Sequence, residues 1–193
     1  MNETAWGGDP PGHRRVAVVG LGNVLLGDDG FGPFVVRHFE ARYDYPEWVS
    51  ASDLGTPGLD LVPFIAEAAA LIVVDTIQLD EPPGTLRLYR REHLLATPRG
   101  QRLTPHDPGL FEALEMLEFR GDGPREVLLV GVVPESCAPQ PGLSATARVA
   151  AEQAVEVVAE ELRRLGIPLS RRSQPLEPDI FWERPVVAGK RTV

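Results

Sequence analysis

Three polar residues stand just after apolar segments, and their side chains can bind metal ions or move protons. Asp29 closes a glycine-rich stretch that follows the run VAVVG, Asp75 directly follows LIVV, and His106 lies in Thr-Pro-His-Asp, just before a helical pattern. In an α/β sheet, functional residues lie beyond the C-terminal ends of the strands. Two carboxylates and an imidazole would then converge. That set suits a borderline divalent metal such as nickel or zinc, with positions left open for ligands from a partner.

Each of these residues also has an ordinary structural interpretation. Asp28 and Asp29 could serve as turn or helix N-cap residues. Asp75 could hydrogen-bond a neighbouring loop, and His106 could be a surface histidine between prolines. One such residue alone would be ambiguous, whereas three at one sheet edge favour a functional site.

The sequence contains neither a complete nucleotide fingerprint nor a familiar nucleophile. Gly20-x-Gly22 is half of a dinucleotide-binding motif, but Leu25 occupies the position of the third glycine. There is no G-x-S-x-G elbow. Cys137 has no histidine close to it in sequence, so we expect a buried, inert thiol. A water molecule is therefore the plausible attacking group in any hydrolysis.

The hydrophobic pattern predicts the elements that position these residues. Apolar or alternating runs predict strands at 16–20, 48–52, 71–75, 84–89 and 127–133, and helical spacing predicts helices at 31–39, 57–68, 108–119 and 145–165. We expect the last helix to bury Val149, Val157, Val158, Leu162 and Leu165. Strands alternating with helices predict a three-layer α/β/α fold with a mostly parallel central sheet. The apolar–polar alternation at 84–89 indicates one antiparallel edge strand.

Composition divides the chain into one domain with two flanking segments. Residues 1–13 are rich in glycine, proline and polar side chains, and we expect them to be disordered. Residues 14–169 form a single catalytic domain in this interpretation. Residues 170–193 form a C-terminal tail, whose apolar cluster at 180–182 we expect to dock on this domain or on a partner.

Charge and cysteine content exclude several classes of protein. The 193 residues carry a formal net charge of −9, which argues against binding of nucleic acid or an anionic membrane. A single cysteine excludes an intramolecular disulfide and a cysteine-rich zinc site, and it suits a reducing compartment. The longest apolar run, 16–26, is too short to span a membrane. We expect a cytoplasmic protein, active as a monomer.

Several segments in the same order resemble the nickel-iron hydrogenase maturation endopeptidases. The segment VVGLGNVLLGDDGFG resembles the N-terminal signature of that family, and Asp53-Leu54-Gly55-Thr56 resembles its D-x-G-T box. LIVVDTI, PPGTLRLY, TPHDPGL and GVVPES followed by GLS recur in the family's order. The resemblance extends over residues 16–166, which is nearly all of the predicted domain.

This resemblance implies an endopeptidase that removes the C-terminal extension from the nickel-loaded large-subunit precursor of a nickel-iron hydrogenase. It implies that Asp29, Asp75 and His106 are the catalytic residues and grip the nickel of the precursor. The enzyme would then have no tightly bound cofactor of its own, because the nickel arrives with the substrate. We expect all three side chains to be at least partly exposed.

The resemblance also implies that Asp53, Gly55 and Thr56 recognise the precursor. Gly55 is expected to allow a tight turn or a positive φ that a side chain would oppose. One departure from the family pattern is Asp107, where glutamine is common; it could cap the next helix or add charge near the metal.

Two other functions remain open at this level. One is a non-proteolytic, metal-dependent checkpoint or chaperone that holds the precursor without cutting it, which needs the same three ligands. The other is a Rossmann-like nucleotide-binding enzyme that uses Gly20 and Gly22, against which the absent third glycine already counts.

Overall fold

The computed structural model describes residues 15–66, 68–96, 104–106 and 109–184, so the predicted disorder of residues 1–13 lies outside the described residues. A five-stranded sheet has the order β3-β1-β4-β6-β5. These strands are β1 (Arg15–Leu21), β3 (Val49–Gly55), β4 (Ala68–Thr76), β5 (Leu86–Arg90) and β6 (Glu126–Val132). All neighbours pair in parallel except β5, which is antiparallel to β6 at the sheet edge. The predicted sheet is therefore confirmed.

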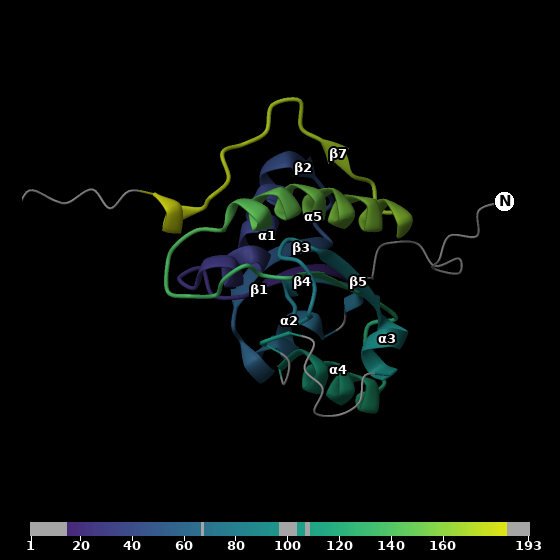
Figure 1. Cartoon of the computed structure of the whole chain (residues 1–193). Helices are drawn as coiled ribbons and strands as arrows, with labels where there is room; N and C mark the ends of the chain where they lie inside the picture. Colours follow the sequence, from purple (N-terminus) through teal and green to yellow (C-terminus); the bar gives the residue numbers. More distant parts are fainter. Residues whose placement is uncertain (1–14, 67, 97–103, 107–108, 185–193) are drawn as a thin grey trace, which may run out of the picture.

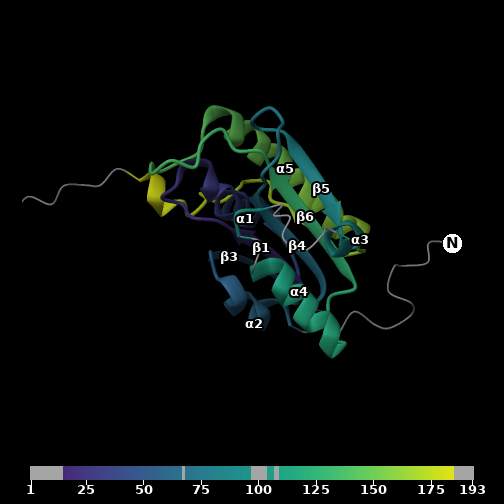
Figure 2. The ribbon, with the colours of Figure 1, turned by 60° about the horizontal axis from the view of Figure 1, so that its bottom comes forward.

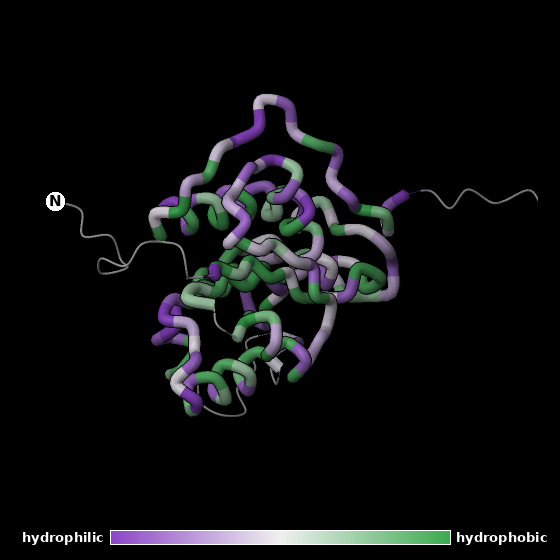
Figure 3. The backbone as a smooth tube through the Cα atoms, turned by 180° about the vertical axis from the view of Figure 1, so that it is seen from behind, coloured by the Kyte–Doolittle hydropathy of each residue, from purple (hydrophilic) through white to green (hydrophobic). Residues whose placement is uncertain are grey.

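The central strands are apolar because both of their faces are covered. Strands β1, β4 and β6 are buried over nearly their whole length, whereas no residue of β5 is fully buried and its second and third residues are exposed. Continuous β-branched and leucine-rich runs are typical of parallel strands with helices on both sides. Figure 3 shows the hydrophobic residues concentrated in these strands.

Helices form a layer on each side of the sheet. Helices α1 (Phe31–Arg42) and α5 (Ala145–Arg164) cover one face, and α4 (Gly109–Arg120) covers the other together with the short α2 (Val62–Ile65), as Figures 1 and 2 show. Each face has its own apolar core, one built on Phe31, Phe39 and Val158 and the other on Leu71, Leu110 and Leu117. The three-layer α/β/α class is thereby confirmed.

Some predicted elements differ in detail. The expected helix at 57–68 is a 3-10 turn, η3 (Gly58–Leu61), followed by the single turn of α2, and Ala68 already belongs to β4. In α5 the predicted apolar face was partly wrong, because Val149 is largely exposed. The buried side of that helix consists mainly of Ala147, Ala150, Ala151, Ala154, Val155, Val158, Ala159 and Leu162. Small side chains allow α5 to pack closely on α1 and the sheet. Helix α3 (Arg91–Ala96) was not predicted.

The segment interpreted as a tail begins with a strand. Strand β7 (Ser170–Arg171) pairs antiparallel with β2 (Tyr43–Asp44), and the chain then arches across the α1–α5 layer to the 3-10 turn η4 (Phe181–Glu183), as Figure 1 shows. Trp182 is only 9% exposed and Phe181 is 60% exposed. Ile180 packs against the core of this domain. The segment therefore docks on its own domain.

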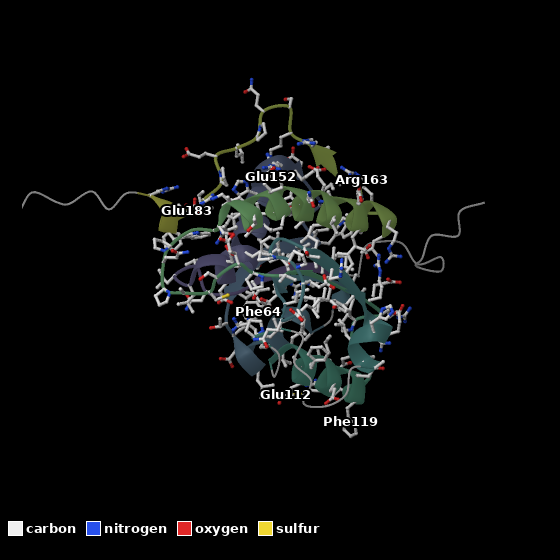
Figure 4. All side chains as sticks on the ribbon, in the orientation of Figure 1. Phe64, Glu112, Phe119, Glu152, Arg163 and Glu183 are labelled. Atoms are coloured by element: carbon white, nitrogen blue, oxygen red, sulfur yellow. The ribbon has the colours of Figure 1, made fainter. Side chains whose placement is uncertain are left out.

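An ion pair also holds the end of that segment. Nη2 of Arg148, the fourth residue of α5, lies 2.7 Å from Oε1 of Glu183; Figure 4 labels Glu183 near the start of that helix. Within the described ranges, no helix is long and apolar enough to cross a membrane.

Candidate active site

Neighbouring strand ends bring Asp29, Asp75 and His106 together. Asp29 lies in the 3-10 turn η2 (Gly27–Gly30) after β1, and Asp75 is the penultimate residue of β4, the strand beside β1. His106 lies ahead of α4 and reaches over both carboxylates. Its Nδ1 is 3.0 Å from Oδ1 and 3.2 Å from Oδ2 of Asp75, and its Nε2 is 3.5 Å from Oδ2 of Asp29. The imidazole therefore bridges the two carboxylates.

Neither Asp28 nor Asp29 caps a helix with its side chain. The starts of η2 and α1 have no side-chain cap hydrogen bond. Instead, Oδ2 of Asp29 accepts a 2.9 Å hydrogen bond from the backbone N–H of Asn23, and Oδ1 lies 3.4 Å from the Thr76 hydroxyl. The turn after β1 thus fixes the carboxylate of Asp29 from one side and β4 fixes it from the other.

Two buried threonines support the cluster, and the sequence analysis did not identify them. The backbone N–H of Thr76 donates to Oδ1 of Asp75 at 2.7 Å, while its hydroxyl faces Asp29. The hydroxyl oxygen of Thr104 accepts the backbone N–H of His106 at 3.2 Å and its side chain also hydrogen-bonds Asp75. The sequence could have indicated these threonines only by their position, because each lies within two residues of a predicted site residue.

The cluster of one imidazole and two carboxylates shifts the pKa of each member. Burial would lower the pKa of His106, but hydrogen bonds and charge from Asp29 and Asp75 outweigh burial and raise this pKa to about 10. Burial would raise the pKa of Asp29, but His106 and the N–H of Asn23 bring it below its ordinary value. Burial raises the pKa of Asp75 in spite of its bonds to His106. At neutral pH the site therefore holds an imidazolium beside an ionised Asp29.

The expectation that all three side chains are partly exposed was wrong. The Asp75 side chain has 0% of its surface exposed, Asp29 has 6% and His106 has 13%. Asp75 belongs to a central strand, and the imidazole lies against its carboxylate. Only His106 and the neighbouring edge of Asp29 can meet another molecule without rearrangement. In the part of the chain that the structure describes, no three or more acidic, histidine or cysteine side chains are arranged to hold a metal ion by themselves.

The glycine pair at the end of β1 serves close packing. A Cβ atom at Gly20 would lie 2.5 Å from the backbone of Gly32, and one at Gly22, where φ is 133°, would lie 1.8 Å from the carbonyl oxygen of Asp29. Both glycines are therefore required by contacts of the protein's own backbone with the start of α1 and with η2, so their presence does not by itself indicate a nucleotide site.

The D-x-G-T box borders the same turn. Oδ1 of Asp53 accepts the backbone N–H of Gly55 at 3.1 Å, and the carbonyl of Gly55 accepts the N–H of Gly22 at 2.9 Å. Gly55 has a φ of 60°, which confirms the positive-φ turn predicted for it. Thr56 is exposed. The box is therefore hydrogen-bonded to the segment between β1 and η2, and its exposed Thr56 adds a polar side chain there.

The prediction of a buried thiol was wrong. Cys137 is exposed, because it lies in the loop after β6 and not in the core. The residue as a whole is exposed but its sulfur is partly buried, and this partial burial together with the nearby carboxylates of Asp29 and Asp28 raises the pKa of its thiol to about 11. The thiol is therefore protonated at neutral pH and is a poor nucleophile. Asp107 lies outside the described residues.

Comparison with known proteins gives a consistent result. The family described as hydrogenase maturation protease matches residues 33–161. The Hydrogenase 2 maturation protease of Escherichia coli K12 is 38% identical over 154 residues, which cover 79% of this chain and 93% of that protein. The hydrogenase expression/formation protein HupD of Bradyrhizobium diazoefficiens is 33% identical over 84% of this chain and 85% of its own length. The solved structure of the hydrogenase maturating endopeptidase HybD from E. coli has 37% identity and a TM-score of 0.76, covering 82% of this chain and 98% of that one.

Proposed function

Because this chain belongs to the hydrogenase maturation protease family and is an endopeptidase of hydrogenase maturation, we propose that it trims the nickel-loaded large-subunit precursor of a nickel-iron hydrogenase. The bond cut is the one that releases the C-terminal extension. The observation that carries this proposal is the imidazole of His106 held between Asp29 and Asp75 beside the D-x-G-T box. We propose a cytoplasmic monomer with no tightly bound cofactor of its own.

The nickel of the precursor is the recognition element in this proposal. Nε2 of His106 and Oδ2 of Asp29 are 3.5 Å apart. The Asp29 carboxylate is ionised at neutral pH and can bind a metal ion brought by the substrate, whereas Nε2 can do so only after the imidazolium has lost its proton. Asp75 holds Nδ1 and thereby orients Nε2, as carboxylates often do for histidines that bind metal ions. Direct contact between nickel and Asp75 requires the imidazole to move, because Asp75 has no exposed surface.

The same residues can assist hydrolysis. A metal ion polarises a carbonyl group or lowers the pKa of bound water. Asp29 is ionised at neutral pH and can accept a proton from an attacking water; its lowered pKa makes it a weak base, so this step depends on the metal ion that lowers the pKa of that water. The protonated thiol of Cys137 leaves water as the attacking group. A precursor without nickel lacks the anchor that places its peptide bond here.

One experiment tests this proposal and separates it from the checkpoint alternative. Purified enzyme is treated with chelator, mixed with nickel-loaded or nickel-free precursor, and the precursor mass is measured over time. We expect loss of the C-terminal extension only from the nickel-loaded form and without added metal. A checkpoint protein would bind that form and leave its mass unchanged. Cleavage of nickel-free precursor at a comparable rate would overturn recognition through nickel.

A further inference from the structure

Asp28, the neighbour of Asp29, has a separate set of partners. It is buried, and its carboxylate points toward the loop of residues 133–144, called here the β6–α5 loop. Oδ2 accepts the backbone N–H of Glu135 at 2.7 Å and the hydroxyl of Ser144 at 2.9 Å, and Oδ1 accepts the backbone N–H of Ser144 at 2.7 Å. Charge-assisted hydrogen bonds of this kind are stronger than neutral ones.

Backbone hydrogen bonds join the same two segments. The N–H of Asp28 donates to the carbonyl of Ser136 at 2.9 Å, and the N–H of Gly27 donates to the carbonyl of Gln140 at 2.7 Å. The N–H of Gln140 donates to the carbonyl of Leu25 at 3.0 Å. Backbone hydrogen bonds therefore join Leu25, Gly27 and Asp28 to Ser136 and Gln140 of the β6–α5 loop.

This arrangement spans the catalytic edge of the sheet. Strand β4 lies between β1 and β6, so a loop that leaves β6 and bonds to the turn after β1 must pass the end of β4, where Asp75 lies. Ser144 also caps α5, since its hydroxyl accepts the N–H of Ala147 at 3.1 Å. Asp28 thus links the catalytic turn to the start of the long helix.

We propose that Asp28 is a positioning residue that holds the Gly27–Gly30 turn and the β6–α5 loop as one unit, so that Asp29 faces His106. The two adjacent carboxylates then have different tasks: Asp29 faces the substrate and Asp28 fixes where Asp29 stands. Small misplacement of a catalytic group is costly, since a shift of about 1 Å can reduce a rate on the order of 100-fold. This inference rests on the proposed cleavage reaction.

The test compares two buried carboxylates. Asp28→Asn keeps the size of the side chain but replaces one acceptor oxygen by an NH2 group, which cannot accept hydrogen bonds from Glu135 and Ser144. The matched control is Glu161→Gln in α5, which removes a buried carboxylate that bonds Arg90 at 2.9 Å, away from the site. We expect D28N to lower kcat on nickel-loaded precursor by about 10- to 100-fold, with KM little changed because the D-x-G-T box is intact. E161Q should retain the wild-type kcat per folded molecule.

Hydrogen exchange provides a readout that does not need the substrate. Amides of both Gly27–Gly30 and the β6–α5 loop should exchange faster in D28N and not in E161Q. Wild-type kcat in folded D28N, a loss confined to KM, or an equal loss in E161Q would each overturn the proposal. Unchanged exchange at Gly27–Gly30 would also overturn it.

A milder variant covers the case in which D28N does not fold. Ser144→Ala removes one donor to Asp28 and should lower kcat in the same direction, by a few-fold; a wild-type kcat would contradict the positioning role. If the proposed function itself were wrong, wild-type protein and E161Q would also leave the precursor uncut, which separates that failure from this one.

Discussion

Nδ1 of His106 lies 3.0 Å from Oδ1 of Asp75, a carboxylate with no exposed surface, while Nε2 of the same ring faces Asp29. The histidine therefore covers Asp75 and leaves part of Asp29 exposed. In the proposed function, Asp75 therefore acts on the substrate through His106, whereas Asp29 acts on it directly. In the enzyme without substrate, the imidazolium of His106 is thus ion-paired with carboxylates of the protein itself.

Removal of the imidazole should abolish trimming. We expect His106→Ala to slow cleavage of nickel-loaded precursor by at least about 100-fold, because it removes both the nickel contact and the link between the two carboxylates. The control is His93→Ala in α3, which changes an exposed histidine outside the site. The measurement is the mass of the precursor over time. Equal cleavage rates for H106A and wild type would contradict the proposal that Asp29, Asp75 and His106 act together.

The same ion pair makes stability depend on pH. The pKa of His106 is raised from 6.5 to about 10 on folding, so its stabilising contribution is complete below pH 6.5 and disappears as pH rises through about 10. The contribution should be on the order of 2 kcal/mol. Denaturant unfolding of wild type and His106→Gln at pH 6.5, 8.5 and 10.5 would measure it. We expect the difference between the two proteins to shrink steadily with pH, and a constant difference would contradict the pairing.

A substitution at Gly55 can test whether the D-x-G-T box recognises the precursor, apart from any effect on stability. Gly55→Val should cost about 1–2 kcal/mol of backbone strain, and the nearest atom to an added Cβ is the carbonyl oxygen of Gly22 at 3.9 Å, so no clash is expected. Gly121→Val is the control, because Gly121 also has a positive φ and open space around it, at the end of α4. Both variants should lose similar stability, but only G55V should lose binding of nickel-loaded precursor. Unchanged binding by folded G55V would remove the box from the recognition surface.

The C-terminal segment should contribute to stability and not to chemistry. Trp182→Ala should lower the free energy of unfolding by about 3 kcal/mol, the usual cost of deleting a buried aromatic side chain, whereas Phe181→Ala should have little effect because Phe181 is largely exposed. A protein ending at Arg171 should be less stable and still trim precursor at 25 °C. A folded but inactive truncation would show that this segment belongs to the active site.

Much of this protein follows from the sequence alone. The buried runs that form β1, β4 and β6 predicted the parallel sheet, because strands covered on both faces must be apolar. The ends of these runs predicted where the candidate site residues lie, because the turns after such strands can be polar. The positive φ of Gly55 was likewise predictable from its residue type. Motif order indicated the family.

Only the tertiary structure decided how the side chains divide their tasks. Periodicity could not show that Asp28 faces the β6–α5 loop while Asp29 faces His106, since adjacent residues in a turn have no fixed alternation. It also could not show that Asp75 is covered by the imidazole, that Cys137 is exposed, or that Trp182 packs on this domain. Each of these depends on contacts between segments far apart in the chain. Strand order and loop path determine those contacts, and local residue pattern does not.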